Sequence, residues 1–256
     1  RVNQPAIHIL LSRVYLYMEN YTECIAEVKK AEQQGIQLLN MVNNLDVIAN
    51  GNLYTPIAYT NPEVEWLFGP CAVANHWEYQ PATAPDFRAL WDQENDQRFL
   101  ANCFKSQDES NTVYMQKPNG SSQLGQSIRS AEAFLNRMEA YALSGEEGLA
   151  LSELNDFRKT RIVGYSDVNL SGQALLDEIR LERRKELCFE GHRWFDLRRY
   201  SVCSQLPFRK QIVHPFHTYN DDGGYTGTRV FVLKENETNV WTFLIPETTI
   251  DFDRIP

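Results

Sequence analysis

The sequence predicts a mainly α-helical protein, in which helical hairpins pack against an irregular, loop-rich layer that contains a few short strands. Two stretches predict the helices. Residues 6–35 and 127–161 each show apolar side chains at helical spacing, interrupted once by turn-forming residues. A third stretch predicts the irregular layer, since residues 51–126 lack this periodicity and are rich in aromatic residues, Pro and Asn. We therefore expect one domain over residues 1–256.

The first hairpin, residues 6–35, contains two amphipathic helices that join near Asn20. We expect Thr22 to cap the N-terminus of the second helix and Gly35 to end it. Residues 127–161 repeat this pattern. Paired helices of this size resemble tetratricopeptide repeats, in which neighbouring hairpins stack and bury a face that none can bury alone.

The two hairpins can be aligned with each other. Placing Arg13 over Arg137 also places Tyr17 over Tyr141. The turn of the first hairpin then corresponds to residues 144–145 of the second. This alignment predicts that both hairpins share one architecture.

Residues 172–200 form the segment around which the chain is organised, because they are strongly charged and also rich in large apolar side chains. At 100° per residue, Leu187 and Leu197 fall in one helical stripe together with charged residues. These have no net charge and are spaced by three or four positions, so we expect them to be buried and to pair along the helix surface. They are Arg183, Glu186, Glu190 and Arg193.

Trp194 belongs to the same stripe, and we expect it to anchor the core beside Leu187 and Leu197. Gly191 interrupts the segment and disfavours a helix by about 1 kcal/mol relative to alanine. Two outcomes are open, since the helix either bends at Gly191 or breaks and restarts at His192. In the second case the stripe does not extend past the break.

The candidate catalytic and metal-binding groups favour a structural role. Glu186 and Glu190 lie one turn apart, but Arg183 and Arg193 flank them and favour ionised carboxylates, whereas an acid catalyst needs a protonated one. The five cysteines are scattered, and the single H-x-x-H pair and the Asn-Asp-Asp run are weak matches to metal-site patterns. We therefore predict no catalytic residue, no metal site and no cofactor.

Charge and hydropathy exclude two further classes of partner. The formal net charge of −9 disfavours nucleic acid, because phosphate binding needs a clustered surplus of Lys and Arg. Apolar runs fall short of the roughly 18 residues that a membrane-spanning helix requires.

The pattern ER-x-x-EL-x-FEGHRWFDLRR at residues 182–199 resembles the signature of the SusD/RagB family. Further stretches resemble family landmarks in the family's order: NPEVEW at 61–66, PDFRALW at 85–91, NDQRF at 95–99 and YMQK at 114–117. The closing IPETTI resembles the family's terminal element, although Thr249 replaces the usual glutamate. The resemblance marks a set of structural signature residues: Arg183, Glu186, Glu190, Arg193, Trp194 and Asp196.

Members of that family are glycan-binding lipoproteins of the Gram-negative outer membrane, and they cap a TonB-dependent transporter of the SusC type. The resemblance therefore implies non-catalytic binding of oligosaccharides or polysaccharides at the cell surface, for polysaccharide utilization and nutrient uptake. Family members are about twice as long, which implies that the signal peptide, the lipid anchor and an N-terminal region are absent from this chain. An alternative is a tetratricopeptide-type scaffold that binds a protein or peptide.

Sugar binding needs flat aromatic rings against C–H faces of the sugar, with polar side chains for its hydroxyls. One stretch of the loop-rich layer supplies both, namely Asn75, His76, Trp77 and Tyr79. Strand alternation could instead direct Trp77 and Tyr79 into the core. Tyr225 and Asp221, in a polar loop near the C-terminus, are the second candidates.

Overall fold

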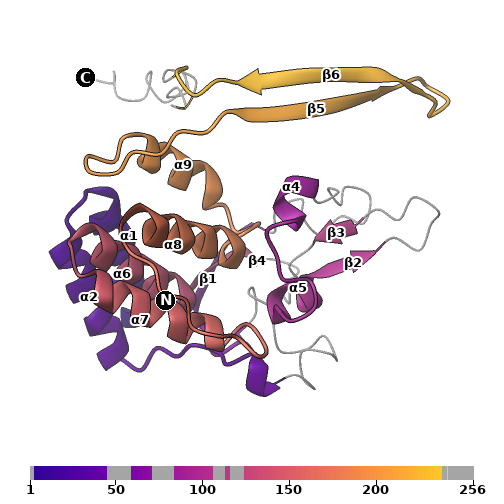
Figure 1. Ribbon diagram of the computed structural model, residues 1–256. Coiled ribbons are helices and arrows are strands. Elements are labelled where there is room, and N and C mark those ends of the chain that lie inside the picture. The colour runs from indigo at the N-terminus through magenta and orange to yellow at the C-terminus, as the bar shows by residue number, and fades with distance from the viewer. Residues whose placement is uncertain are drawn as a thin grey trace, which may run out of the picture. The chain divides into compact units, whose positions relative to one another are not determined.

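The computed structural model describes residues 3–44, 59–70, 84–105, 113–115, 124–237 and 241 (Figure 1). The chain divides into two compact units, Arg1–Arg193 and Trp194–Pro256. Each unit is described by itself, and the expectation of a single domain stays a prediction.

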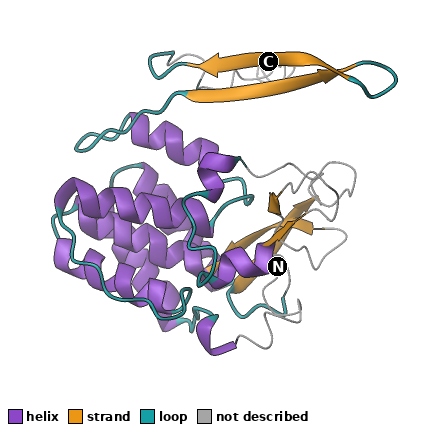
Figure 2. Ribbon diagram, turned by 45° about the vertical axis from the view of Figure 1, so that its right-hand side comes forward, coloured by secondary structure: helices purple, strands orange, loops and turns teal. Residues whose placement is uncertain are grey.

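The first unit is mainly helical, as predicted, and its strands are short (Figure 2). The longer helices are α1 (Gln4–Tyr17), α2 (Tyr21–Gln33), α6 (Ser130–Leu143), α7 (Glu147–Lys159) and α8 (Gly172–Glu186). The short elements are the 3-10 helix η1 (Val42–Asn44), α4 (Pro85–Arg88), α5 (Gln97–Asn102), β1 (Val64–Pro70), β2 (Cys103–Lys105), β3 (Val113–Met115) and β4 (Leu124–Arg129). Strand β1 pairs with β4, and β2 with β3, both antiparallel.

The two predicted hairpins are α1–α2 and α6–α7, and they have equal dimensions. Each consists of a 14-residue helix followed by a 13-residue helix. The cap differs from the prediction, because α2 begins at Tyr21 and the side chain of Asn20, not Thr22, accepts from the Glu23 backbone N–H at 3.3 Å. An Asn side chain at this position satisfies one of the free N–H groups of the first turn.

The predicted alignment of the hairpins is two residues out of register at the turn. Helix α1 ends at Tyr17 and α6 at Leu143, whereas the predicted alignment pairs Tyr17 with Tyr141. The turns contain equivalent residues of positive φ, Glu19 at 57° and Gly145 at 87°. Equivalent positions of the two hairpins are therefore those that share the backbone conformation of the turn. The matching Arg and Tyr side chains do not mark equivalent positions.

Small residues allow the hairpins to pack closely. Ala131, Leu135 and Met138 of α6 are fully buried with Leu154 of α7 and Ile179 of α8. A second cluster joins α1 and α2 to the start of α6 and to β4: Ala6, Ile9, Val28, Ala31, Ile36, Ile128 and Ala133. Helix α6 is therefore buried among the helices of both hairpins and α8, which is the stacking that the repeat pattern predicts.

The segment from 172 to 200 is not one helix. Helix α8 ends at Glu186, and α9 (Arg193–Ser201) begins after a turn in which Phe189 and Gly191 have φ values of 61° and 81°. Of the two open outcomes, the break is the correct one. The shared stripe is therefore wrong, since Leu187 packs with α6 and α7 while Trp194 packs elsewhere.

The second unit contains α9 and an antiparallel hairpin of β5 (Ile212–Tyr219) and β6 (Tyr225–Leu233). Trp194, at the start of α9, stacks on Trp241 with ring centroids 4.9 Å apart. Leu197 and Tyr200 are buried in the same cluster. Asp196, which is also buried, accepts from Arg199 Nε one helical turn later at 3.0 Å.

Candidate functional site

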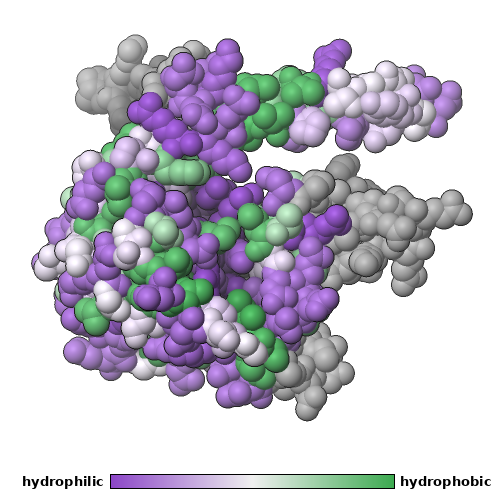
Figure 3. Space-filling view, in the orientation of Figure 1, coloured by the Kyte–Doolittle hydropathy of each residue, from purple (hydrophilic) through white to green (hydrophobic). Residues whose placement is uncertain are grey.

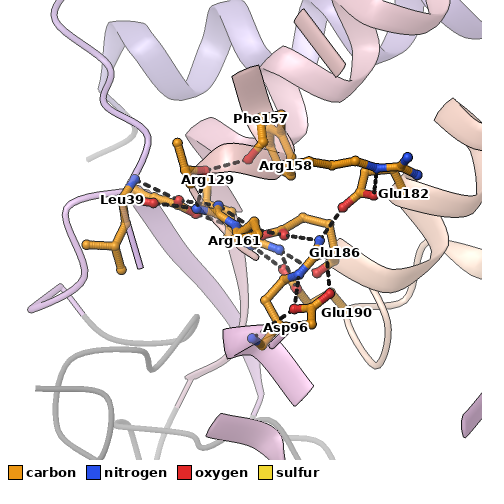
Figure 4. A network of polar contacts seen from close by, with 12 residues as sticks. Leu39, Asp96, Arg129, Phe157, Arg158, Arg161, Glu182, Glu186 and Glu190 are labelled. Carbon is orange, nitrogen blue, oxygen red and sulfur yellow. Dashed lines mark hydrogen bonds and ion pairs between the residues drawn. The ribbon is translucent and has the colours of Figure 1, made fainter. Parts of the chain in front are cut away.

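Glu186, at the last turn of α8, is the centre of a buried network of charged side chains (Figure 4). Its Oε1 accepts from Arg129 Nη1 at 2.6 Å, and its Oε2 accepts from Arg98 Nη1 at 2.9 Å and from Arg161 Nε at 3.1 Å. The three arginine side chains are at most 1% exposed. Segments that are far apart in the sequence therefore converge on one carboxylate.

Further carboxylates neutralise these arginines. Glu63, which precedes β1, pairs with Arg161 Nη2 at 2.6 Å and with Arg129 Nη1 at 2.9 Å. Asp96 pairs with Arg98 at 2.7 Å, and Glu190 with Arg129 at 2.7 Å. Nearly every charged group of the network therefore faces an opposite charge, and this attraction offsets part of the cost of burying it.

Glu182 shows the electrostatic balance of this network. Burial raises the pKa of its carboxyl, but attraction to Arg98, 2.6 Å away, and to Arg158, 2.7 Å away, outweighs burial and lowers the pKa to about 2. Glu132 follows the same rule, since Arg13 lowers its pKa to about 2 despite burial. These carboxylates are therefore ionised at neutral pH.

The predicted burial of Arg183 and Glu186 is confirmed, since both are 0% exposed. The predicted pairing of four residues along one helix is wrong, because Glu190 and Arg193 lie beyond the end of α8. Arg183 instead donates to Asn136 Oδ1 of α6 at 2.7 Å. Helical spacing therefore predicted the burial of two of the four charges, since Glu190 and Arg193 are only half-buried. The partners of the buried pair come from other elements.

The network fits a structural role. A carboxylate that accepts from several guanidinium groups is held ionised and cannot act as a general acid. Of the pair considered above, Glu186 accepts from three guanidinium groups, and both carboxylate oxygens of Glu190 accept from Arg129. The network of charged side chains joins α8 to β4, to the end of α7 and to the loop-rich layer around Asp96.

The first set of predicted sugar-binding residues, Asn75, His76, Trp77 and Tyr79, lies outside the described residues. The second set is described. Tyr225 begins β6 with 62% of its surface exposed, and Asp221 lies in the exposed turn that precedes it. The structure places Tyr225 in a group of side chains that the sequence reasoning missed.

That group is the tip cluster of the β5–β6 hairpin, which we define as His217, Tyr219, Tyr225 and Thr228. Tyr219 and Tyr225 are cross-strand partners with centroids 6.0 Å apart, and His217 lies 5.9 Å from Tyr225. Side chains alternate along β5, so His217 and Tyr219 lie on one face. This alternation in the sequence is the signal that could have grouped the two residues.

Metal binding finds no support in the part of the chain that the structure describes, where no group of three or more His, Cys, Asp or Glu side chains is arranged for it. The H-x-x-H pair fails for a geometric reason. His214 and His217 are three residues apart on β5 and so point to opposite faces of the strand. Among the same described residues, no helix combines the length and apolarity needed to cross a membrane.

Comparison with known proteins identifies similar sequences and folds. A model of the SusD family matches residues 13–252. The comparison with curated proteins finds no match. Among solved structures, the chain resembles a SusD-like carbohydrate binding protein from Bacteroides vulgatus with a TM-score of 0.59 and 23% identity, over 91% of this chain and 51% of that one.

Two further crystal structures are similar. A SusD-like protein from Bacteroides fragilis has a TM-score of 0.63 and 16% identity, over 98% of this chain and 64% of that one. A SusD superfamily protein from Bacteroides thetaiotaomicron has a TM-score of 0.61 and 25% identity, over 77% of this chain and 50% of that one. The chain thus spans 50% to 64% of the length of these proteins.

Proposed function

The chain belongs to the SusD family, and on this premise we propose that it binds oligosaccharides or polysaccharides without cleaving them. The family match over residues 13–252 is the observation that carries the proposal. One structural relative is described as a carbohydrate binding protein, which supports the same ligand class. The pairing of the Glu186 and Glu190 carboxylates with arginine supports a role without catalysis at those residues.

We assign the main sugar contacts to the aromatic stretch of the loop-rich layer. Trp77 and Tyr79 would stack on the C–H faces of sugar rings, while Asn75 and His76 would bond to hydroxyl groups. Tyr225 and Asp221 would supply a second contact. Stacking of sugar rings on a few aromatic side chains gives weak binding, with dissociation constants in roughly the micromolar to millimolar range.

The same family membership supports a place for this activity. We propose that the protein acts at the surface of the outer membrane, held by a lipid anchor, and delivers its glycan to a TonB-dependent transporter of the SusC type. The net charge of −9 agrees with a partner other than nucleic acid.

A binding measurement tests the proposal. The chain is titrated with a panel of neutral hexasaccharides in a calorimeter, and the sugar is recovered and sized afterwards. We expect Trp77→Ala to weaken binding without changing the melting temperature, and Tyr79→Ala to do so to a smaller extent. Phe195→Ala is the control, because Phe195 is an aromatic residue of α9 with 48% exposure. A shortened sugar, or unfolding of Trp77→Ala, would contradict the proposal.

A second candidate function is the binding of a peptide by the helical hairpins. An open groove of about 480 Å³ lies along α6 and α7, with Phe134, Tyr141, Leu149 and Phe157 in its lining. Leu149 is 51% exposed. If this groove is the site, Leu149→Ser would abolish binding to a peptide library, and the sugar titration would show no heat.

A further inference from the structure

The tip cluster owes its arrangement to an irregularity in the hairpin. Thr218 pairs with Gly227 and Tyr219 with Tyr225, so β6 contains one extra residue, Thr226. Gly227 has a φ of +155°, which residues with side chains rarely adopt. In a regular strand Tyr225 and Thr228, three positions apart, would point to opposite faces. The bulge brings them to the same face, which is a common use of bulges near binding sites.

Hydrogen bonds fix the rings of this face. The Thr228 hydroxyl oxygen lies 2.7 Å from the Tyr225 hydroxyl and 2.8 Å from His217 Nδ1. Tyr219 and His217 each meet the Tyr225 ring edge to face, with interplanar angles of 70° and 62°. Tyr219 and Tyr225 nevertheless remain 61% and 62% exposed. The cluster is therefore held in place while its rings stay open to solvent.

The turn beside the cluster supplies polar groups. Asn220 Oδ1 accepts from the Gly224 backbone N–H at 2.6 Å, which leaves Asp221 and Asp222 exposed at the tip. A Cβ on Gly224 would lie only 3.1 Å from Asn220 Oδ1, so this turn favours glycine. Exposed carboxylates next to uncharged rings can accept from sugar hydroxyls.

We propose that the tip cluster is a stacking surface for a neutral oligosaccharide, with Tyr219 and Tyr225 as the platform and Asp221 as a hydroxyl acceptor. This inference rests on the proposed function, and it adds a site made by His217, Tyr219, Tyr225 and Thr228 that does not depend on the stretch around Trp77. Aromatic rings that are already fixed lose little conformational entropy on binding. This favours the binding of a ligand that makes only weak contacts, such as a sugar.

The side chains at the tip of the hairpin differ from those of an apolar protein-docking surface. In Figure 3 the base of the hairpin is hydrophobic, whereas the end that carries the turn is intermediate to hydrophilic. Exposed aliphatic residues lie toward the base, at Val213, Val230 and Val232. The tip combines aromatic rings, hydroxyls and carboxylates, which are the groups that recognise sugars.

The opposite face of the same hairpin provides a matched control. Phe216 and Phe231 are 51% and 56% exposed and pack edge to face with centroids 6.4 Å apart. They pair across the strands with Arg229 and His214, so they lie on the other face from the tip cluster. Their substitution removes half-exposed aromatic rings from the same hairpin without touching the proposed site.

The test is a titration of the chain and its variants with the neutral hexasaccharide panel. We expect Tyr225→Ala and Tyr219→Ala each to weaken binding of the best ligand by about five- to tenfold. Tyr225→Phe keeps the ring but loses the bond to Thr228, and we expect a loss of about twofold. Phe216→Ala should bind like the unchanged chain.

The outcomes separate this inference from the proposed function. Sugar binding that persists unchanged in Tyr219→Ala and Tyr225→Ala overturns the tip site together with the second contact assigned to Tyr225, and it leaves sugar binding by the stretch around Trp77 standing. Absence of binding to every sugar by the unchanged chain overturns both. Equal losses in Phe216→Ala and Tyr225→Ala would mean that the hairpin as a whole is perturbed, which also overturns the specific site. Far-ultraviolet circular dichroism confirms that each variant is folded.

Discussion

Replacing Glu186 with glutamine should lower the free energy of unfolding by about 3–5 kcal/mol. Glutamine keeps the shape of the side chain but removes the charge that faces three guanidinium groups. Arg129, Arg98 and Arg161 donate to this carboxylate at 2.6, 2.9 and 3.1 Å, and all are buried. Removing one partner from a buried charge network leaves the remaining charges uncompensated, and this penalty exceeds the energy of any single hydrogen bond.

Urea denaturation followed by circular dichroism measures this change. Lys159→Ala is the reference variant, because its pairs with Asp156 and Asp167 are exposed to solvent, which screens their attraction, so its loss should leave the free energy of unfolding almost unchanged. A double-mutant cycle of Glu186→Gln with Arg98→Met then isolates the energy of that pair. A loss below about 1 kcal/mol for Glu186→Gln would refute the reasoning, since it would mean that the arginines are stabilised without their carboxylate.

Three further predictions concern other parts of the molecule. Glu182 and Glu132 have pKa values of about 2 in the folded protein, against an ordinary value of 4.5, so the unfolded state binds more protons in acid. The stability that these carboxylates contribute above pH 4.5 should therefore be lost as the pH falls toward 2, and urea denaturation midpoints measured across this range would show the loss. Asn20→Ala should lower the free energy of unfolding by about 1 kcal/mol through loss of the α2 cap, whereas Thr22→Ala should have little effect. Trp194→Ala should cost about 3 kcal/mol because it removes the stack on Trp241, and an unchanged melting temperature with lost sugar binding would contradict the structural role.

The helices could be predicted from the sequence because their signals are local. The apolar spacing in residues 6–35 and 127–161 reflects which side of each helix packs, and both hairpins are present with equal helix lengths. The break after α8 was one of two outcomes that Gly191 allowed. Gly191 adopts φ of 81°, a left-handed conformation that glycine adopts without a steric penalty.

The partners of Glu186 could not be predicted, because they depend on contacts between distant segments. Arg161, Arg129 and Arg98 are 25, 57 and 88 residues away in the sequence. Helical periodicity identifies a buried charge but carries no information about the element that faces it. The tip cluster was missed for a related reason, since the bulge at Gly227 sets which side chains of β6 share a face with β5, and a bulge is a property of strand pairing.

The signature residues and the proposed sugar contacts face opposite physical requirements. Glu186 is useful to the fold because it is fully buried and surrounded by arginines, and a sugar could reach it only if that network opened. In the proposed site, Tyr225 serves a ligand because its ring is exposed and already fixed by Thr228. Variants of the first kind should therefore lose stability and binding together. Variants of the second kind should lose binding alone, and this difference identifies site residues in a chain whose strongest sequence motif is structural.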